Sequence, residues 1–132
     1  MGNTLHASTA ELAFLMEAGI VYRDAHEFSE AETIFRGVRE LSPSSEIPEI
    51  ALGTLRFEQG DLPGAVKHYQ QALEKNPQSA WGHSHLGEAL LFLRAPADAR
   101  RHLERAIALD PKGSTGRFAR GMLQLLGIVE RE

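Results

Sequence analysis

The sequence predicts an all-α protein, a superhelix of antiparallel helix pairs with about seven helices in total. Three observations predict this fold class. The chain repeats itself every 34 residues, apolar residues recur at helical intervals within each repeat, and prolines fall only where a helix begins or has ended. The length of 132 residues is enough for one domain with a core, and 42% hydrophobic residues exclude a disordered chain.

The repeat is visible as columns of equivalent residues at a constant spacing. Pro43, Pro77 and Pro111 lie 34 residues apart. An alanine precedes each proline by twelve residues, an aromatic residue or leucine by eight, and a small residue or valine by five. A column of glycines keeps the same step: Gly19, Gly53, Gly87 and Gly121. Matching columns at one period indicate a tandem array of one structural unit.

Each repeat is expected to form two antiparallel helices. In its second half, the alanine, the aromatic residue or leucine and the small residue fall at i, i+4 and i+7, on one face of a helix. We expect the glycine of the first helix to face the alanine that opens the second, which lets the two backbones approach closely. The final proline cannot continue a helix. Pro48, Pro63 and Pro96 fall in expected first helical turns, where a missing N–H does little harm.

The predicted elements follow one another along the chain. Residues 1–11 are an N-terminal segment with the first helix cap, since Ser8 and Glu11 have the spacing of a capping box. The three repeats occupy residues 12–45, 46–79 and 80–113. Residues 114–132 place Phe118 and Met122 on one apolar face and are expected to form a solitary helix that covers the end of the third repeat.

A 34-residue helix-turn-helix unit with these columns resembles the tetratricopeptide repeat family. The second repeat carries most of the family's pattern: Leu52, Gly53, Gly60, Ala65, Tyr69, Ala72 and Pro77. Departures from it are Arg56, which replaces the usual tyrosine of the first helix, and His26 and Arg94, which replace the turn glycine. A short array with an apolar groove is also similar to the small chaperones of bacterial type III secretion, which hold an aggregation-prone segment of an exported subunit.

The resemblance implies a concave groove, lined by the first helix of each pair, that binds a partner. Carrying the family's groove positions onto this sequence gives the candidate partner-binding residues. These are Met16, Ile20, Ile47, Ile50, Thr54, Phe57, Trp81, Ser84, Glu88, Phe118 and Met122. The same positions also give Ala13, Arg23, Leu91, Thr115 and Leu125. Trp81 and Met16 are the expected main contacts, because tryptophan often anchors interfaces and methionine adapts to varied ligands. The alternative is that several of these side chains are core between repeats.

The partner is expected to be a protein or peptide. In the family, co-chaperones that grip the acidic C-terminal tails of heat-shock chaperones use a clamp of Lys, Asn and Arg side chains. The corresponding positions here are Met16, Ile20, Ala51, Trp81 and His85, so the same mechanism is not expected. The expected function is therefore a non-enzymatic adaptor or chaperone that binds a helical or extended client segment.

Self-assembly is the alternative function. In that case the groove or the edge of the array is buried in a homo-oligomer. Residues 1–66 carry four arginines against eleven acids, a net charge of -7, whereas residues 67–132 carry ten basic against seven acidic residues, a net charge of +3. Unlike halves can attract one another between subunits. Nucleic-acid binding is not expected, because the basic residues are mixed with acids rather than clustered.

No enzymatic activity, metal or cofactor is expected. His83 and His85 point about 200° apart on a helix and cannot both face one metal ion. His68 and His102 share one repeat position, which favours a packing role. Neither a phosphate-binding glycine loop nor a nucleophile motif appears.

The expected location is the cytoplasm. The sequence has no cysteine, which favours a reducing compartment. Its first ten residues lack the patterns of a secretory signal and of myristoylation. No apolar run approaches the length of about 20 residues that a membrane span needs, so no membrane association is expected.

Overall fold

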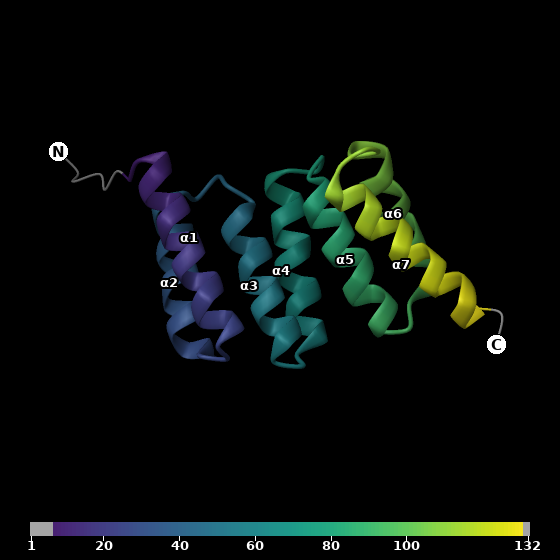
Figure 1. Cartoon of the computed structure of the whole chain (residues 1–132), viewed down its shortest axis with the longest axis horizontal. Coiled ribbons are helices and arrows are strands. Elements are labelled where there is room, and N and C mark those ends of the chain that lie inside the picture. The colour runs from purple at the N-terminus through teal and green to yellow at the C-terminus, as the bar shows by residue number, and fades with distance from the viewer. Residues whose placement is uncertain (1–6, 131–132) are drawn as a thin grey trace.

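The computed structural model describes residues 7–130, a range that contains seven α-helices and no strand. The helices are α1 (Thr9–Asp24), α2 (Phe28–Leu41), α3 (Ile47–Glu58), α4 (Leu62–Lys75), α5 (Ala80–Phe92), α6 (Pro96–Leu109) and α7 (Ser114–Glu130). They stand side by side along the long axis, with the termini at opposite ends (Figure 1). The predicted all-α array is confirmed. No helix in the described range is both long and apolar enough to cross a bilayer.

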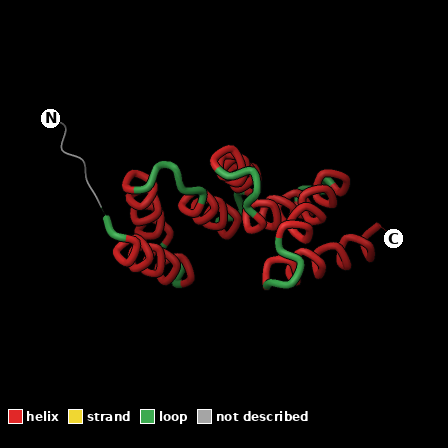
Figure 2. The backbone as a smooth tube through the Cα atoms, turned by 90° about the horizontal axis from the view of Figure 1, so that it is seen from above, coloured by secondary structure: helices red, strands yellow, loops and turns green. Residues whose placement is uncertain are grey.

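The helices pack as three antiparallel pairs and a final single helix. The closest packing joins α1 to α2, α3 to α4 and α5 to α6, and α7 packs on α6 and α5. Seen from above, the pairs follow one another in a row (Figure 2). Within residues 7–130, α1, α3, α5 and α7 also contact one another in sequence, whereas α2, α4 and α6 do not. The first-helix side is therefore the inner, concave side of the row.

The ends of the helices follow the sequence signals. Ser8 Oγ accepts from the Glu11 amide at 3.1 Å, and the Glu11 carboxylate accepts from the Ser8 amide at 3.0 Å, which confirms the capping box. Pro48, Pro63 and Pro96 lie at the first or second position of their helices. The predicted segments 1–11 and 114–132 lie partly outside the described residues. The repeat bounds stay a prediction, because helix pairs do not fix where a repeat starts.

The glycine column allows the two helices of a pair to approach, but in the first two pairs the nearest neighbour of the glycine is an aromatic ring and not the alanine that we expected. A methyl group built on Gly53 would lie 2.3 Å from Tyr69 Cε1, and one on Gly19 would lie 2.3 Å from Phe35 Cε1. The ring four residues beyond the alanine reaches across and rests on the glycine. Gly19 and Gly53 therefore make room for a buried ring, whereas Gly87 in the third pair faces Leu103 and the Ala99 carbonyl, and Gly121 has open space around it.

The turn within each pair uses a left-handed residue. Gly60 has a φ of 82°, and His26 and Arg94 each have a φ of 61°. A residue with a side chain pays about 1–2 kcal/mol for this conformation, which glycine avoids. The departures from the family's turn glycine thus keep the turn and add strain.

A buried carboxylate joins the first repeat to the second. Glu49, with a side chain 5% exposed, lies 3.3 Å from Arg39 Nη1 on α2 and 3.4 Å from Lys75 Nζ on α4. His68 Nδ1 on α4 donates to it at 3.0 Å. Burial raises the pKa of Glu49, but the hydrogen bond from His68 and the charges of Arg39 and Lys75 outweigh burial and leave that pKa below its usual value.

Candidate functional site

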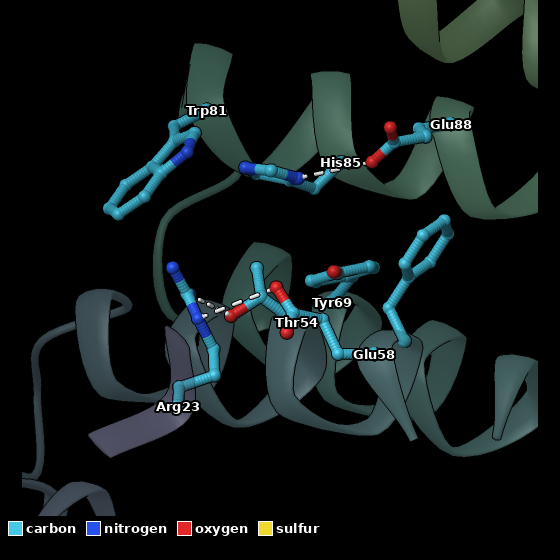
Figure 3. A pocket seen from close by; sticks show the side chains of 8 residues that line it. Arg23, Thr54, Glu58, Tyr69, Trp81, His85 and Glu88 are labelled. Carbon is cyan, nitrogen blue, oxygen red and sulfur yellow. Dashed lines mark hydrogen bonds and ion pairs between the residues drawn. The ribbon is translucent and has the colours of Figure 1, made fainter. Parts of the chain in front are cut away.

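A pocket of about 320 Å³ opens on the concave side of the row. Residues from α1, α3, α4 and α5 line it, and we call it the groove pocket (Figure 3). The lining residues are Arg23, Thr54, Phe57, Glu58, Tyr69, Trp81, His85 and Glu88. The groove pocket is therefore lined by side chains from all three helix pairs. It forms only because neighbouring pairs pack against one another.

Polar contacts fix the floor of the groove pocket. Arg23 Nη1 donates to Thr54 Oγ1 at 2.8 Å, and Thr54 Oγ1 donates to the Ala51 carbonyl one turn earlier at 2.7 Å. Arg23 Nε lies 3.7 Å from Glu58 Oε1, and the same guanidinium contacts the Asp24 carboxylate at 3.2 Å. All three guanidinium nitrogens of Arg23 already have protein partners. This arginine therefore has a structural role and holds α1 against α3.

Aromatic rings form the opposite wall. The His85 ring stacks on the Tyr69 ring, with centroids 5.6 Å apart and planes 25° apart. Trp81 lies 5.7 Å from His85, and Phe118 of α7 lies 6.1 Å from it. Trp81 is 38% exposed and Phe118 is 36% exposed, so both rings offer surface to a ligand. The last helix thereby extends the aromatic wall beyond the third pair.

Two buried polar atoms in the groove pocket lack hydrogen-bond partners. Tyr69 is fully buried, and its Oη meets no donor or acceptor within the described residues. His85 Nδ1 lies 3.6 Å from Glu88 Oε1, which is too long for a hydrogen bond. Burial, together with the nearby charge of Glu88, raises the pKa of Tyr69, so its hydroxyl keeps its proton. Buried polar groups are normally paired, and an exception calls for an explanation.

The structure brings only some of the predicted groove residues together. Thr54, Phe57, Trp81 and Glu88 line the groove pocket. Met16 and Ile47 line a separate pocket of about 210 Å³ between α1 and the start of α3. The other half-buried candidates pack on the core. These are Ile20 beside the core of the first two pairs, and Met122 beside the core under α7.

Two candidates require correction. Ile50 is fully buried in a core cluster with Tyr69 and Leu86, and Ser84 is 1% exposed, with its Oγ bonded to the Trp81 carbonyl at 2.8 Å. Both therefore lie beneath the groove surface, and for Ile50 the covering residues Leu86 and Ala89 come from the next helix pair. Met16 also packs against the core cluster that contains Phe35, so it has a structural role in addition to any contact with a partner.

Several pocket residues were missing from the candidate set. Tyr69 comes from α4, a second helix, and the family's groove positions include first helices only. Glu58 lies one residue beyond a groove position. His85 corresponds to a clamp position of the family and lies outside the groove positions carried over. The hydroxyl of Tyr69 could have indicated its role, because a tyrosine in a core position usually needs a hydrogen-bond partner.

The histidines separate as the helical geometry predicts. His83 Nδ1 lies 2.9 Å from His102 Nδ1, and its Nε2 donates to the Pro77 carbonyl at 2.8 Å. His85 instead faces the groove pocket. Burial and the neighbouring His83 lower the pKa of His102. Within residues 7–130, no three His, Asp or Glu side chains gather as a metal site would require.

Two family models match the chain and identify its family. The model described as "TPR repeat" matches residues 53–91, and the model described as "Tetratricopeptide repeat" matches residues 85–127. Together they span residues 53–127, more than half of the sequence. The chain belongs to the tetratricopeptide repeat family, a family of protein–protein interaction modules with extended concave binding surfaces. The resemblance noted from the sequence is confirmed.

Curated relatives match over part of the chain. Hsp70-Hsp90 organizing protein 1 of Glycine max is 33% identical over 72 residues, which are 54% of this chain and 13% of that protein. Hsp70-Hsp90 organizing protein of Triticum aestivum is 32% identical over 72 residues, 54% of this chain and 12% of that protein. The chain thus spans a small part of these longer relatives.

Solved structures share the fold over nearly the whole chain. The first tetratricopeptide domain of Spaghetti (RPAP3), bound to the HSP90 peptide SRMEEVD, is 18% identical with a TM-score of 0.79, and the match covers 97% of this chain and 99% of that one. The Yersinia enterocolitica type III secretion chaperone SycD, in complex with a peptide of the translocator YopD, is 18% identical with a TM-score of 0.77, covering 93% and 97%. At these identities the likeness shows the fold.

Proposed function

We propose that the concave groove of this protein binds a helical or extended segment of a client protein, and that the protein acts as a non-enzymatic adaptor or chaperone. One observation carries the proposal. The groove pocket gathers an exposed tryptophan, Trp81, and a buried unpaired hydroxyl, that of Tyr69, on the surface where three helix pairs meet. An aromatic anchor beside unsatisfied polar atoms is what a peptide ligand would complete.

The solved neighbours support a peptide ligand. Both the Spaghetti domain and SycD are seen with peptides, and both share the fold of this chain. For this protein, we favour an internal client segment over an acidic C-terminal tail. The positions of the carboxylate clamp hold Met16, Ile20, Ala51, Trp81 and His85 here. A role as a secretion chaperone, in the cytoplasm, is the more specific form of this proposal.

A peptide selection tests the groove assignment. Dodecapeptides selected from a randomised phage library on the immobilised protein are synthesised, and their affinities are measured by calorimetry. Trp81→Ala is expected to weaken binding about 30-fold, which corresponds to about 2 kcal/mol for an interface anchor. Phe14→Ala removes a ring that is 70% exposed on α1 and that lies outside the groove pocket, so it serves as the matched control. Equal affinity for the wild type and Trp81→Ala would refute the assignment.

Self-assembly is the second candidate, and a different surface favours it. Phe92 is 59% exposed, Leu125 49% and Ile128 52%, and all three border an apolar hollow of about 770 Å³ at the C-terminal edge of the array. A second copy of the chain that covered this edge would remove the exposed apolar area. Light scattering after size exclusion, across a range of protein concentrations, distinguishes a monomer from an oligomer. Phe92→Ser together with Ile128→Ser is expected to convert such an oligomer to monomers.

A further inference from the structure

We propose that the groove pocket receives a basic side chain of the client, arginine or lysine, whose cation pairs with the Glu88 carboxylate and donates a hydrogen bond to Tyr69 Oη beside the Trp81 ring. The inference rests on the proposed function of the groove. It specifies the chemistry of the ligand at one position.

The charged residues that line the groove pocket favour a cation. They are two carboxylates, Glu58 and Glu88, and one arginine, Arg23. Arg23 is already engaged within the protein by Asp24 and Glu58. An acidic ligand would therefore find no free cation among the residues that line the groove pocket.

Glu88 is the carboxylate in the groove pocket that lacks a permanent cation. Its side chain is 20% exposed, and in the described part of the chain its one ion-pair partner is His85, at 3.6 Å. Glu58, by comparison, lies beside the Arg23 guanidinium. A partly buried carboxylate loses hydration, and a paired cation with good hydrogen bonds compensates for this loss. A guanidinium or ammonium group from a client supplies such a cation.

Tyr69 Oη provides an independent indication of a polar ligand. Tyr69 lines the groove pocket, and its hydroxyl is buried and has no partner within the described residues. Figure 3 shows it in the space between Arg23, His85 and Glu58. A phenol that keeps its proton still accepts a hydrogen bond through its lone pairs. The N–H groups of arginine or lysine are donors only, so they match this acceptor and the Glu88 carboxylate together.

The size and walls of the groove pocket suit one long cationic side chain. Its volume of about 320 Å³ lies at the lower end of the range of about 300–1,000 Å³ for small-molecule sites. Trp81 and Phe57 line it with aromatic surface. An aromatic face attracts a cation, most strongly when the face is tryptophan. Aliphatic carbons of the same side chain would cover the rings.

The test uses the dodecapeptide library on three proteins. Selections on the wild type are expected to enrich arginine or lysine at one peptide position, and selections on Glu88→Gln are expected to lose this enrichment. Glu17→Gln is the matched control, since it removes the same charge from an exposed position of α1 outside the groove pocket. Its selection is expected to resemble that of the wild type. Circular dichroism checks that each variant is folded.

A binding cycle then measures the contact directly. Replacing the enriched basic residue of one selected peptide by norleucine is expected to weaken its binding to the wild type about tenfold or more, and to leave its binding to Glu88→Gln nearly unchanged. Tyr69→Phe is expected to weaken binding of the basic peptide about threefold to tenfold, by removal of one hydrogen bond.

The outcomes separate this inference from the groove assignment. Peptides that depend on Trp81 but show no basic preference would overturn the inference and leave the proposed function standing. Equal enrichment on Glu88→Gln and Glu17→Gln would do the same. Recovery of no peptide, or of peptides indifferent to Trp81→Ala, would overturn the groove function and the inference with it.

Discussion

Replacing Tyr69 by phenylalanine is expected to make the free protein more stable. The tyrosine is fully buried and its hydroxyl has no hydrogen-bond partner in the described range. A buried polar group without a partner costs about 1–3 kcal/mol of desolvation. Phenylalanine keeps the ring and removes that cost. The first repeat already contains the substituted arrangement, because Phe35 packs on Gly19 as Tyr69 packs on Gly53, and a methyl group built on either glycine would lie 2.3 Å from the ring.

The expected gain for Tyr69→Phe is about 1 kcal/mol, the lower end of that range. Loss of the oxygen leaves a small space, which offsets part of the gain. Urea denaturation followed by circular dichroism gives the free energy of unfolding. Tyr22→Phe removes a hydroxyl from a half-exposed ring on α1, and its effect is expected to stay within about 0.5 kcal/mol.

A loss of stability in Tyr69→Phe would refute the reasoning. It would mean that the hydroxyl already has a hydrogen-bond partner in solution, for example a bound water molecule. A donor from a client would then not be needed to pair it. The stabilising outcome, combined with weaker peptide binding by the same variant, would identify Tyr69 as a residue kept for binding at the expense of stability.

Three further predictions concern the scaffold, each measured as a free energy of unfolding in urea. Glu49→Ala should cost about 3 kcal/mol, because it leaves three partners of a buried carboxylate unpaired. The lowered pKa of Glu49 means that its contribution is present above the usual pH range of carboxyl titration and is lost as pH falls through the folded-state pKa, so the variant should respond less to acid than the wild type. Arg94→Gly should add about 0.5–1 kcal/mol by relieving a left-handed residue, while Gly60→Ala should remove about 1 kcal/mol; opposite signs would contradict the strain argument. Gly53→Ala should cost about 1–3 kcal/mol through its contact with a buried ring, whereas Gly37→Ala, with open space around it, should stabilise α2 by about 0.5–1 kcal/mol.

The ends of the helices could be predicted from the sequence because they depend on local chemistry. The capping box at Ser8, the prolines at positions 48, 63 and 96 and the repeating glycines act within one helix or one pair. The left-handed turns were harder to predict, since His26 and Arg94 adopt a conformation that their residue types do not favour. In these turns the neighbouring helices impose the geometry and the residue accepts the strain.

The groove was predicted less well because it depends on how neighbouring pairs pack. A positional rule gives the face of each first helix, but that face is wide, and part of it is buried in the packed array. Ile50 and Ser84 fall in the covered part, whereas Trp81 and Phe57 fall in the open part. The positional rule did not include Tyr69, because Tyr69 lies on a second helix. Its importance comes from an unpaired atom, and pairing is a property of three-dimensional contacts.

Trp81 is the one tryptophan of the sequence, and it lies in the groove pocket. Indole emission responds to the polarity around the ring, and this ring is 38% exposed in the free protein. Any ligand that enters the groove pocket and displaces water from the indole would therefore shift the intrinsic fluorescence of the whole protein. The unmodified chain carries its own optical reporter of occupancy, at the position where occupancy matters.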